Sequence, residues 1–183
     1  FYECDGRTHM DNLGTYYVQH WYPSYVAGIA AGAMSKSGKL GYVASFPVPS
    51  VYSGTNAFLM GARTVNPAAT VQCIVINSWF DPQAATQAGT ALLDNGCDVL
   101  FGIMDEAGYL QVAEARGAKA VMWNTDLRRD GPKAYITSIM VDFKPFYVEQ
   151  VRRRLAGEWT PTYGLLPMGQ GVDRDAWGET VPP

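Results

Sequence analysis

From about residue 39, short apolar runs alternate with longer Ala-rich stretches along the chain. The runs are rich in Val and Ile and apolar at nearly every position, which is typical of strands covered by helices on both faces. The predicted strands span residues 40–45, 71–77, 98–102, 120–123 and 134–141.

The stretches between these strands carry apolar residues at helical spacing and signals for helix ends. We expect the three helices to be capped by Ser50, Asp81 and Asp105, because short polar side chains bond the free N–H groups of a first turn. Gly96 and Gly117 stand where a left-handed C-terminal cap belongs.

Strands that alternate with helices predict right-handed βαβ units and a parallel sheet. The fold class is therefore α/β, with a Rossmann-like parallel sheet and helices on both faces. If the sheet order begins 2-1-3, Cys73 and Cys97 lie two strand spacings apart, roughly 9–10 Å. That distance exceeds the roughly 7 Å limit between the Cα atoms of a disulfide, so we predict that they are not bridged.

The segments on either side of this region are less regular. A helix is expected over residues 24–37, and its Ala and Gly residues suit close packing, but no sheet is evident for it to pack on. This predicts a packing partner outside the chain. A helix over 145–155 should direct Phe146, Val151 and Leu155 inward, and a short strand is expected at 163–166.

Composition narrows the classes of function. The formal net charge is −3 and the sequence pI is near 5.3, which excludes a nucleic-acid binder that works through bulk positive charge. No apolar run approaches the roughly 18 residues of a membrane span. No Cys/His cluster suggests a metal, and for His9 and His20 a surface or packing role is favoured.

Chemistry-bearing residues gather where the predicted strands end. Ligands of open parallel sheets bind at the carboxyl ends of the strands, so these positions should share one edge. Aromatic rings there can stack on a flat ligand, at about 1–3 kcal/mol per base, while amides and carboxylates read its N–H groups. The candidate ligand-binding residues are Phe46, Trp79, Asp105, Trp123, Asn124 and Asp126.

Other roles stay open for several residues near this edge. Phe80 is expected in the core, Trp123 could cover the sheet edge, and Asn124 and Asp126 could stabilise a turn. An enzyme using Asp105 and Asp126 as an acid/base pair is a weak alternative, because no nucleophile elbow, metalloprotease motif or phosphate loop is present. We predict no catalytic residue, metal or cofactor.

Several stretches resemble the basic membrane protein family, the PnrA-like substrate-binding lipoproteins of ABC importers. The similar segments include Gly-Tyr-Val-Ala-Ser-Phe-Pro at 41–47, Gly-Ala-Arg-Thr-Val-Asn-Pro at 61–67, Asn-Ser-Trp-Phe-Asp-Pro at 77–82 and Trp-Asn-Thr-Asp at 123–126. The resemblance runs over nearly the whole chain. It implies the type I periplasmic binding protein fold, in which two α/β lobes close on a ligand.

The resemblance also implies a domain plan. The chain would lack roughly the first third of a family member. Residues 1–38 would end an N-terminal lobe, and 39–142 would form the C-terminal ligand-binding lobe. Residues 143–183 would supply a helix that packs back on the N-terminal lobe and an irregular tail.

The function implied is capture of a purine base or purine nucleoside for import. Phe46 matches the stacking aromatic, and Asn124 and Asp126 match an acidic pair. Family members that bind nucleosides carry Asp at the position of Asn124 and Lys at the position of Val141, which puts recognition of ribose in doubt and favours a free base.

The expected partners are ABC permease subunits at the periplasmic or extracellular face of the membrane, reached through a lipid anchor outside this chain, with no nucleic acid. The alternatives are a sugar or other small-molecule receptor, or the ligand-sensing domain of a transcriptional regulator, on the same fold.

Overall fold

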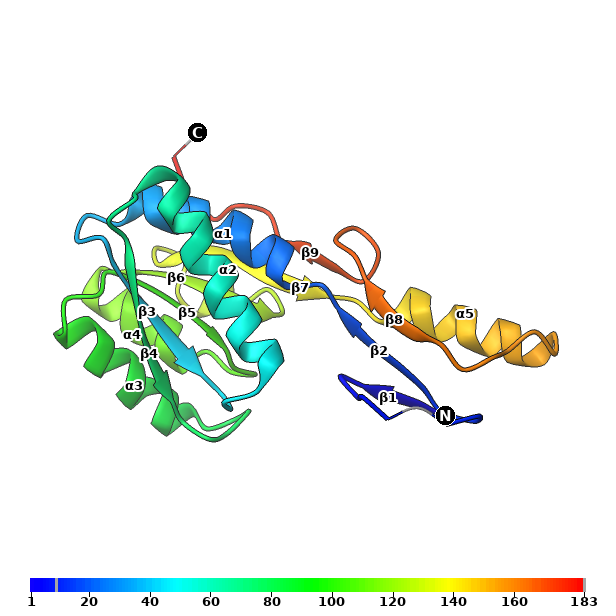
Figure 1. Cartoon of the computed structure of the whole chain (residues 1–183). Helices are drawn as coiled ribbons and strands as arrows, with labels where there is room; N and C mark the ends of the chain where they lie inside the picture. The colour runs from blue at the N-terminus through cyan, green and yellow to red at the C-terminus, as the bar shows by residue number, and fades with distance from the viewer. Residues whose placement is uncertain (9, 183) are drawn as a thin grey trace. The chain divides into compact units, whose positions relative to one another are not determined.

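The computed structural model describes residues 1–8 and 10–182, so the predicted role of His9 lies outside the described residues. The chain divides into two compact units (Figure 1). The larger unit contains residues 21–140 and the C-terminal residues from 174 onward, and the smaller unit contains residues 1–20 and 141–173.

The larger unit is built on a parallel sheet. Its strands are β3 (Lys39–Ala44), β4 (Thr70–Val75), β5 (Val99–Ile103), β6 (Lys119–Asn124) and β7 (Tyr135–Val141), in the order β4-β3-β5-β6-β7. β9 (Val172–Arg174), where the chain returns to this unit, follows β7 in the strand order. The predicted strands and the 2-1-3 beginning of the sheet are confirmed. In the described residues the three cysteines are free, as predicted for Cys73 and Cys97.

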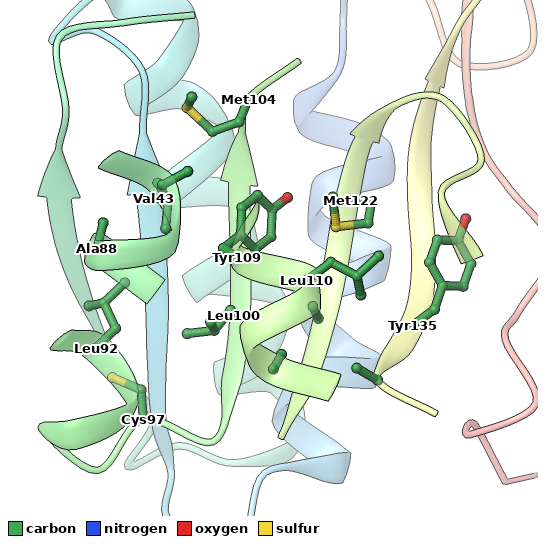
Figure 2. Packing of buried hydrophobic residues seen from close by; sticks show 14 residues of the cluster. Val43, Ala88, Leu92, Cys97, Leu100, Met104, Tyr109, Leu110, Met122 and Tyr135 are labelled. Carbon is green, nitrogen blue, oxygen red and sulfur yellow. The ribbon is translucent and has the colours of Figure 1, made fainter. Parts of the chain in front are cut away.

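Helices α3 (Pro82–Asp94) and α4 (Gly108–Arg116) cover one face of the sheet. Figure 2 shows the core between them and the strands, in which Leu92 of α3 and Leu110 of α4 lie against Leu100 and Met122. These four side chains are fully buried or nearly so. Their packing fixes α3 and α4, and therefore the loops that precede both helices at the carboxyl edge of the sheet.

The other face is covered by α1 (Trp21–Met34) and α2 (Pro49–Val65). The two helices meet backbone to backbone: a Cβ on Gly28 would lie 2.1 Å from the Phe58 carbonyl oxygen, and one on Gly61 would lie 2.0 Å from that of Tyr25. Only glycine permits this approach. The expectation that the Ala/Gly-rich helix needs a partner outside the chain was wrong, because α2 is that partner.

The predicted helix caps are correct only in part. The Asp81 carboxylate accepts a hydrogen bond of 2.9 Å from the backbone N–H of Ala84, as expected. Ser50 and Asp105 are not caps: Val48 precedes α2, which begins at Pro49, and Ala107 precedes α4. Proline at the first position starts α2 without a side-chain cap, because it lacks the N–H that a cap would satisfy.

The smaller unit holds a three-stranded parallel sheet in the order β1-β2-β8, formed by β1 (Tyr2–Cys4), β2 (Gly14–Val18) and β8 (Tyr163–Leu166). The strand at 163–166 is confirmed, whereas β1 and β2 were not predicted. Helix α5 (Lys144–Leu155) packs through Phe146, whose ring stacks on Tyr16 with centroids 4.5 Å apart. His20 is buried beside Tyr17, which confirms a packing role.

The far end of α5 differs from the prediction. Val151 is 60% exposed and Leu155 is 84% exposed, so neither points into a core of the described chain. With Phe1, Tyr2 and Trp159 they line a hollow of about 580 Å³ in the smaller unit. None of the predicted ligand residues belongs to this hollow. No helix in the part of the chain that the structure describes is long and apolar enough to span a membrane.

Candidate ligand-binding site

The loops that follow β3, β4 and β5 are tied together at the carboxyl edge of the larger sheet. The backbone N–H of Ser78 donates to the carbonyl of Ser45 over 3.1 Å, and that of Asp105 donates to the carbonyl of Trp79 over 3.0 Å. These bonds hold the residues just past three strands at fixed positions. The structure therefore brings most of the predicted ligand residues to one edge.

Phe46 and Trp79 form an aromatic pair on this edge. Their ring centroids lie 5.2 Å apart and the ring planes are inclined by 50°. Trp79 is 44% exposed and Phe46 is half-buried, so part of the aromatic surface faces solvent. Phe80, expected in the core, is 65% exposed, because it lies in the loop between β4 and α3 rather than on the strand.

Asp105 and Asn124 also meet. Partial burial raises the pKa of the Asp105 carboxyl above its ordinary value, while a hydrogen bond from the Asn124 side chain lowers it in part. Asn124 has a left-handed backbone with φ of 68°, and Asn77, in the loop that follows β4, has φ of 57°. Such non-glycine backbone positions cluster at functional sites, where the surrounding structure holds them.

Asp126 is engaged by a residue that the sequence did not single out. The Nε of Arg128 lies 2.9 Å from each carboxylate oxygen of Asp126, and Arg128 Nη2 lies 2.6 Å from Asp175 Oδ2. Arg128 opens the short 3-10 helix η1 (Arg128–Asp130) after β6. Arg128 thus brings a positive charge to this edge, paired with Asp126 and Asp175.

Trp123 differs from the other candidates because it is only 7% exposed. On β6 its neighbour Met122 belongs to the core under α3 and α4, and side chains alternate along a strand. The Trp123 ring therefore faces the side of α1 and α2. In this structure it contributes to packing and presents little surface to a ligand.

Glu106 is a further acidic residue at this edge that sequence reasoning missed. Its side chain is only 7% exposed; one oxygen accepts a hydrogen bond from the backbone N–H of Gly108, and Oε1 has no partner. Burial raises the pKa of Glu106, and the charges of Asp81 and Asp105 add to the rise, although the bond from Gly108 lowers it. A signal was present in the sequence: Glu106 lies two residues before the glycine that begins α4.

The site contains acceptors, aromatic surface and one paired cation. Among the described residues no group of three or more His, Cys, Asp or Glu side chains is arranged to hold a metal ion. The geometry suits a flat, uncharged ligand that presents N–H or O–H donors to carboxylate and amide oxygens.

Comparison with known proteins identifies the family. A family model described as "ABC transporter substrate-binding protein PnrA-like" matches residues 1–166. The chain belongs to this family. The resemblance seen in the sequence is thus confirmed, and the family is one of transporter binding proteins rather than of enzymes.

Two relatives extend the comparison. A purine-binding protein of Brucella abortus is 36% identical over 159 residues, which cover 87% of this chain and 45% of the relative. A protein of Haloferax volcanii named "Putative ABC transporter glucose-binding protein" is 34% identical over 182 residues, covering 99% of this chain and 46% of the relative. The chain therefore spans less than half the length of these relatives.

The fold has counterparts among solved structures. An ABC transporter solute-binding protein of Aeropyrum pernix matches with a TM-score of 0.81 at 18% identity, covering 96% of this chain and 53% of that one. At this identity the match shows the fold alone. It confirms the α/β periplasmic-binding-protein fold of this chain.

Proposed function

We propose that the larger unit binds a purine base or purine nucleoside, as part of the substrate-binding component of an ABC importer. The observation that carries the proposal is the placing of the Phe46–Trp79 pair beside the Asp105–Asn124 pair at one sheet edge. The first pair offers a stacking surface, and the second offers directional hydrogen bonds.

The aromatic geometry favours one stacking platform over a sandwich between these two rings. A base inserted between parallel rings needs their planes roughly 7 Å apart, twice the contact distance of about 3.5 Å between carbon atoms. Phe46 and Trp79 are closer, at 5.2 Å, and inclined by 50°. A purine would therefore lie on the exposed side of the pair, and lobe closure could cover its second face.

The polar groups suit a neutral heterocycle. The Asp105 carboxylate can accept from a ring or exocyclic N–H, and the Asn124 amide offers both a donor and an acceptor. The two relatives support the ligand class differently: the Brucella abortus protein is named as purine-binding, and the Haloferax volcanii protein carries a glucose-binding name.

A sugar is the second candidate. The exposed ring of Trp79 can pack against the apolar face of a sugar as well as against a base, and the name of the Haloferax volcanii relative favours this candidate. A sugar would present hydroxyl groups to Asp105 and Asp126. Its smaller apolar face would cover less of the Phe46–Trp79 pair than a purine would, so it would gain less binding energy from stacking.

The wider role is proposed with the ligand. The larger unit, residues 21–140 with the segment from 174 onward, would act as the C-terminal ligand-binding lobe, and the smaller unit would belong with the N-terminal lobe. The protein would deliver its ligand to membrane permease subunits from the periplasmic or extracellular face, held there by a lipid anchor. No covalent chemistry is required, because capture by lobe closure suffices.

The test is a titration of tryptophan fluorescence with adenine, hypoxanthine, guanine, adenosine, inosine, ribose and glucose, repeated by calorimetry. It is run on this chain and on the full-length protein. We expect saturable quenching by purines, reduced in a Trp79→Phe variant. Tighter binding of bases than of nucleosides would agree with the uncharged Asn124. Binding of glucose or ribose without purines would favour the second candidate, and no response to any ligand would overturn the purine assignment.

A further inference from the structure

The C-terminal segment contributes to the candidate site from beyond the family match, which ends at residue 166. The segment runs along β7: the backbone N–H of Asp175 donates to the Ser138 carbonyl over 2.9 Å, and that of Gly178 donates to the Ile136 carbonyl over 2.7 Å. The hydroxyl of Thr137 donates to the Asp175 carbonyl over 2.9 Å. These bonds fix Asp175 against the strand.

The close fit of this segment depends on Gly178. A Cβ at this position would lie 2.0 Å from the Tyr135 carbonyl oxygen, so any other residue would push the segment away from β7. The backbone of residues 175–178 is therefore fixed in one register against β7. This register keeps the Asp175 side chain beside Tyr135.

The Asp175 carboxylate has two side-chain partners. It accepts a hydrogen bond of 2.8 Å from the Tyr135 hydroxyl and one of 2.6 Å from Arg128 Nη2. Partial burial raises the pKa of Asp175, but the hydrogen bonds from Tyr135, the Ala176 backbone and Arg128 outweigh it, so the net pKa lies below the ordinary value. The carboxylate is thus ionised at neutral pH.

The guanidinium of Arg128 is thereby held on three sides. Its carbon lies 5.2 Å from the centre of the Tyr135 ring, its Nη2 bonds Asp175, and its Nε bonds both oxygens of Asp126. The backbone N–H of Arg128 adds a hydrogen bond of 3.0 Å to Asp126. The Arg128 side chain is 40% exposed. Without Asp175 its guanidinium could therefore turn toward solvent and leave this position.

We propose that Asp175 is a positioning residue of the ligand site, which holds Arg128 and through it fixes the orientation of Asp126. This inference rests on the proposed function, because Asp126 is a predicted ligand residue. The carboxylate oxygens of the paired Asp126 have lone pairs left for N–H or O–H donors of a ligand. The segment after residue 166 is then part of recognition and not only an edge cover.

The experiment is a double-mutant cycle with Asp175→Asn and Asp126→Asn in the full chain, using adenine and adenosine as probes. We expect Asp175→Asn to weaken binding about fivefold and Asp126→Asn about tenfold, in the usual range for coupled polar groups. The double variant should bind no more weakly than Asp126→Asn alone, because Asp175 acts only through Asp126. Additive losses, or unchanged binding by Asp175→Asn, would overturn the proposal.

A matched control is Asp94→Asn, which breaks an exposed pair with Arg116 at 2.8 Å on other elements of the same unit. It should leave the affinity unchanged. NMR of the Arg128 Nε–H supplies a readout that needs no ligand: the signal should be protected in the wild type and lost in Asp175→Asn. If the wild type binds neither probe, the purine assignment fails, while a signal unchanged by Asp175→Asn refutes the role of Asp175 independently.

Discussion

The Asn124 side chain donates a hydrogen bond to the Asp105 carboxylate, joining the ends of the neighbouring strands β6 and β5. Asn124 is the last residue of β6, whereas Asp105 follows the end of β5, and Asn124 makes the contact from a left-handed backbone position. The bond joins a donor to an acceptor at this edge before any ligand is bound. Preorganisation of this kind lowers the ordering cost of binding.

The first prediction concerns the charge of this pair. Asn124→Asp removes the donor and places a second carboxylate beside Asp105, so the pKa of Asp105 should rise further. Carboxyl carbon NMR during a pH titration measures the change. Asn77→Asp is the matched control, because Asn77 is also left-handed but lies in the loop that follows β4. An Asp105 titration that is unchanged by Asn124→Asp would contradict the contact.

The second prediction concerns the aromatic platform. Phe46→Ala should weaken purine binding by about tenfold, because a stacked base gains about 1–3 kcal/mol from an aromatic face. Calorimetric titration of the variant checks the value. Met60→Ala, which trims an exposed apolar side chain of α2, should leave binding unchanged. Equal affinities for Phe46→Ala and the wild type would remove Phe46 from the site.

The third prediction follows from Glu106. Its pKa is raised above the ordinary value of 4.5 in the folded chain, chiefly by burial. The folded state then holds the proton to higher pH than the unfolded state, so this group lowers stability as pH rises above 4.5 through the raised pKa. Glu106→Gln should therefore be more stable than the wild type at neutral pH, and the difference should shrink on acidification.

Urea unfolding at several pH values measures this difference. Glu149→Gln gives the opposite control: a hydrogen bond from Arg152 lowers the pKa of Glu149, so any stabilisation it supplies is lost as pH falls. Because Glu149 is exposed, its effect should be small. A stability difference for Glu106→Gln that grows on acidification would show that Glu106 is ionised and stabilising in the fold.

The fourth prediction concerns the contact between α1 and α2. Gly28→Ala should destabilise the larger unit by about 1–3 kcal/mol, the usual cost of overpacking, because the new Cβ would collide with the Phe58 carbonyl. Thermal and urea unfolding give the value. Gly164→Ala is the control, since a Cβ there meets no atom within 4 Å. Equal destabilisation by both changes would point to a general loss of glycine rather than to this contact.

The strands of the larger sheet were predictable because both of their faces are buried, which makes the apolar runs continuous. β2 was not predicted because its five residues, Gly14–Val18, lie outside the alternating apolar and Ala-rich stretches that mark the larger sheet. The packing of α1 on α2 was also not predicted. Glycines at helical spacing indicate close approach, but they do not name the partner that approaches.

The candidate site was predictable where it depends on strand ends, as for Phe46, Trp79, Asp105 and Asn124. It was not predictable where it depends on contacts between distant segments. Arg128 reaches Asp175 only because the C-terminal segment returns along β7, and no local pattern marks that return. Trp123 also follows a strand pattern, but alternation places its ring on the face covered by α1 and α2.

The division of the chain between the two units has a consequence for the order of folding. The parallel pairing of β2 with β8 joins Thr15 to Tyr163, so the sheet of the smaller unit waits for a segment made late in synthesis. Residues 21–140 of the larger unit are contiguous and can collapse earlier, because nearby segments close smaller loops. On the ribosome the pairing of β2 with β8 would therefore form after the contiguous part of the larger unit has collapsed.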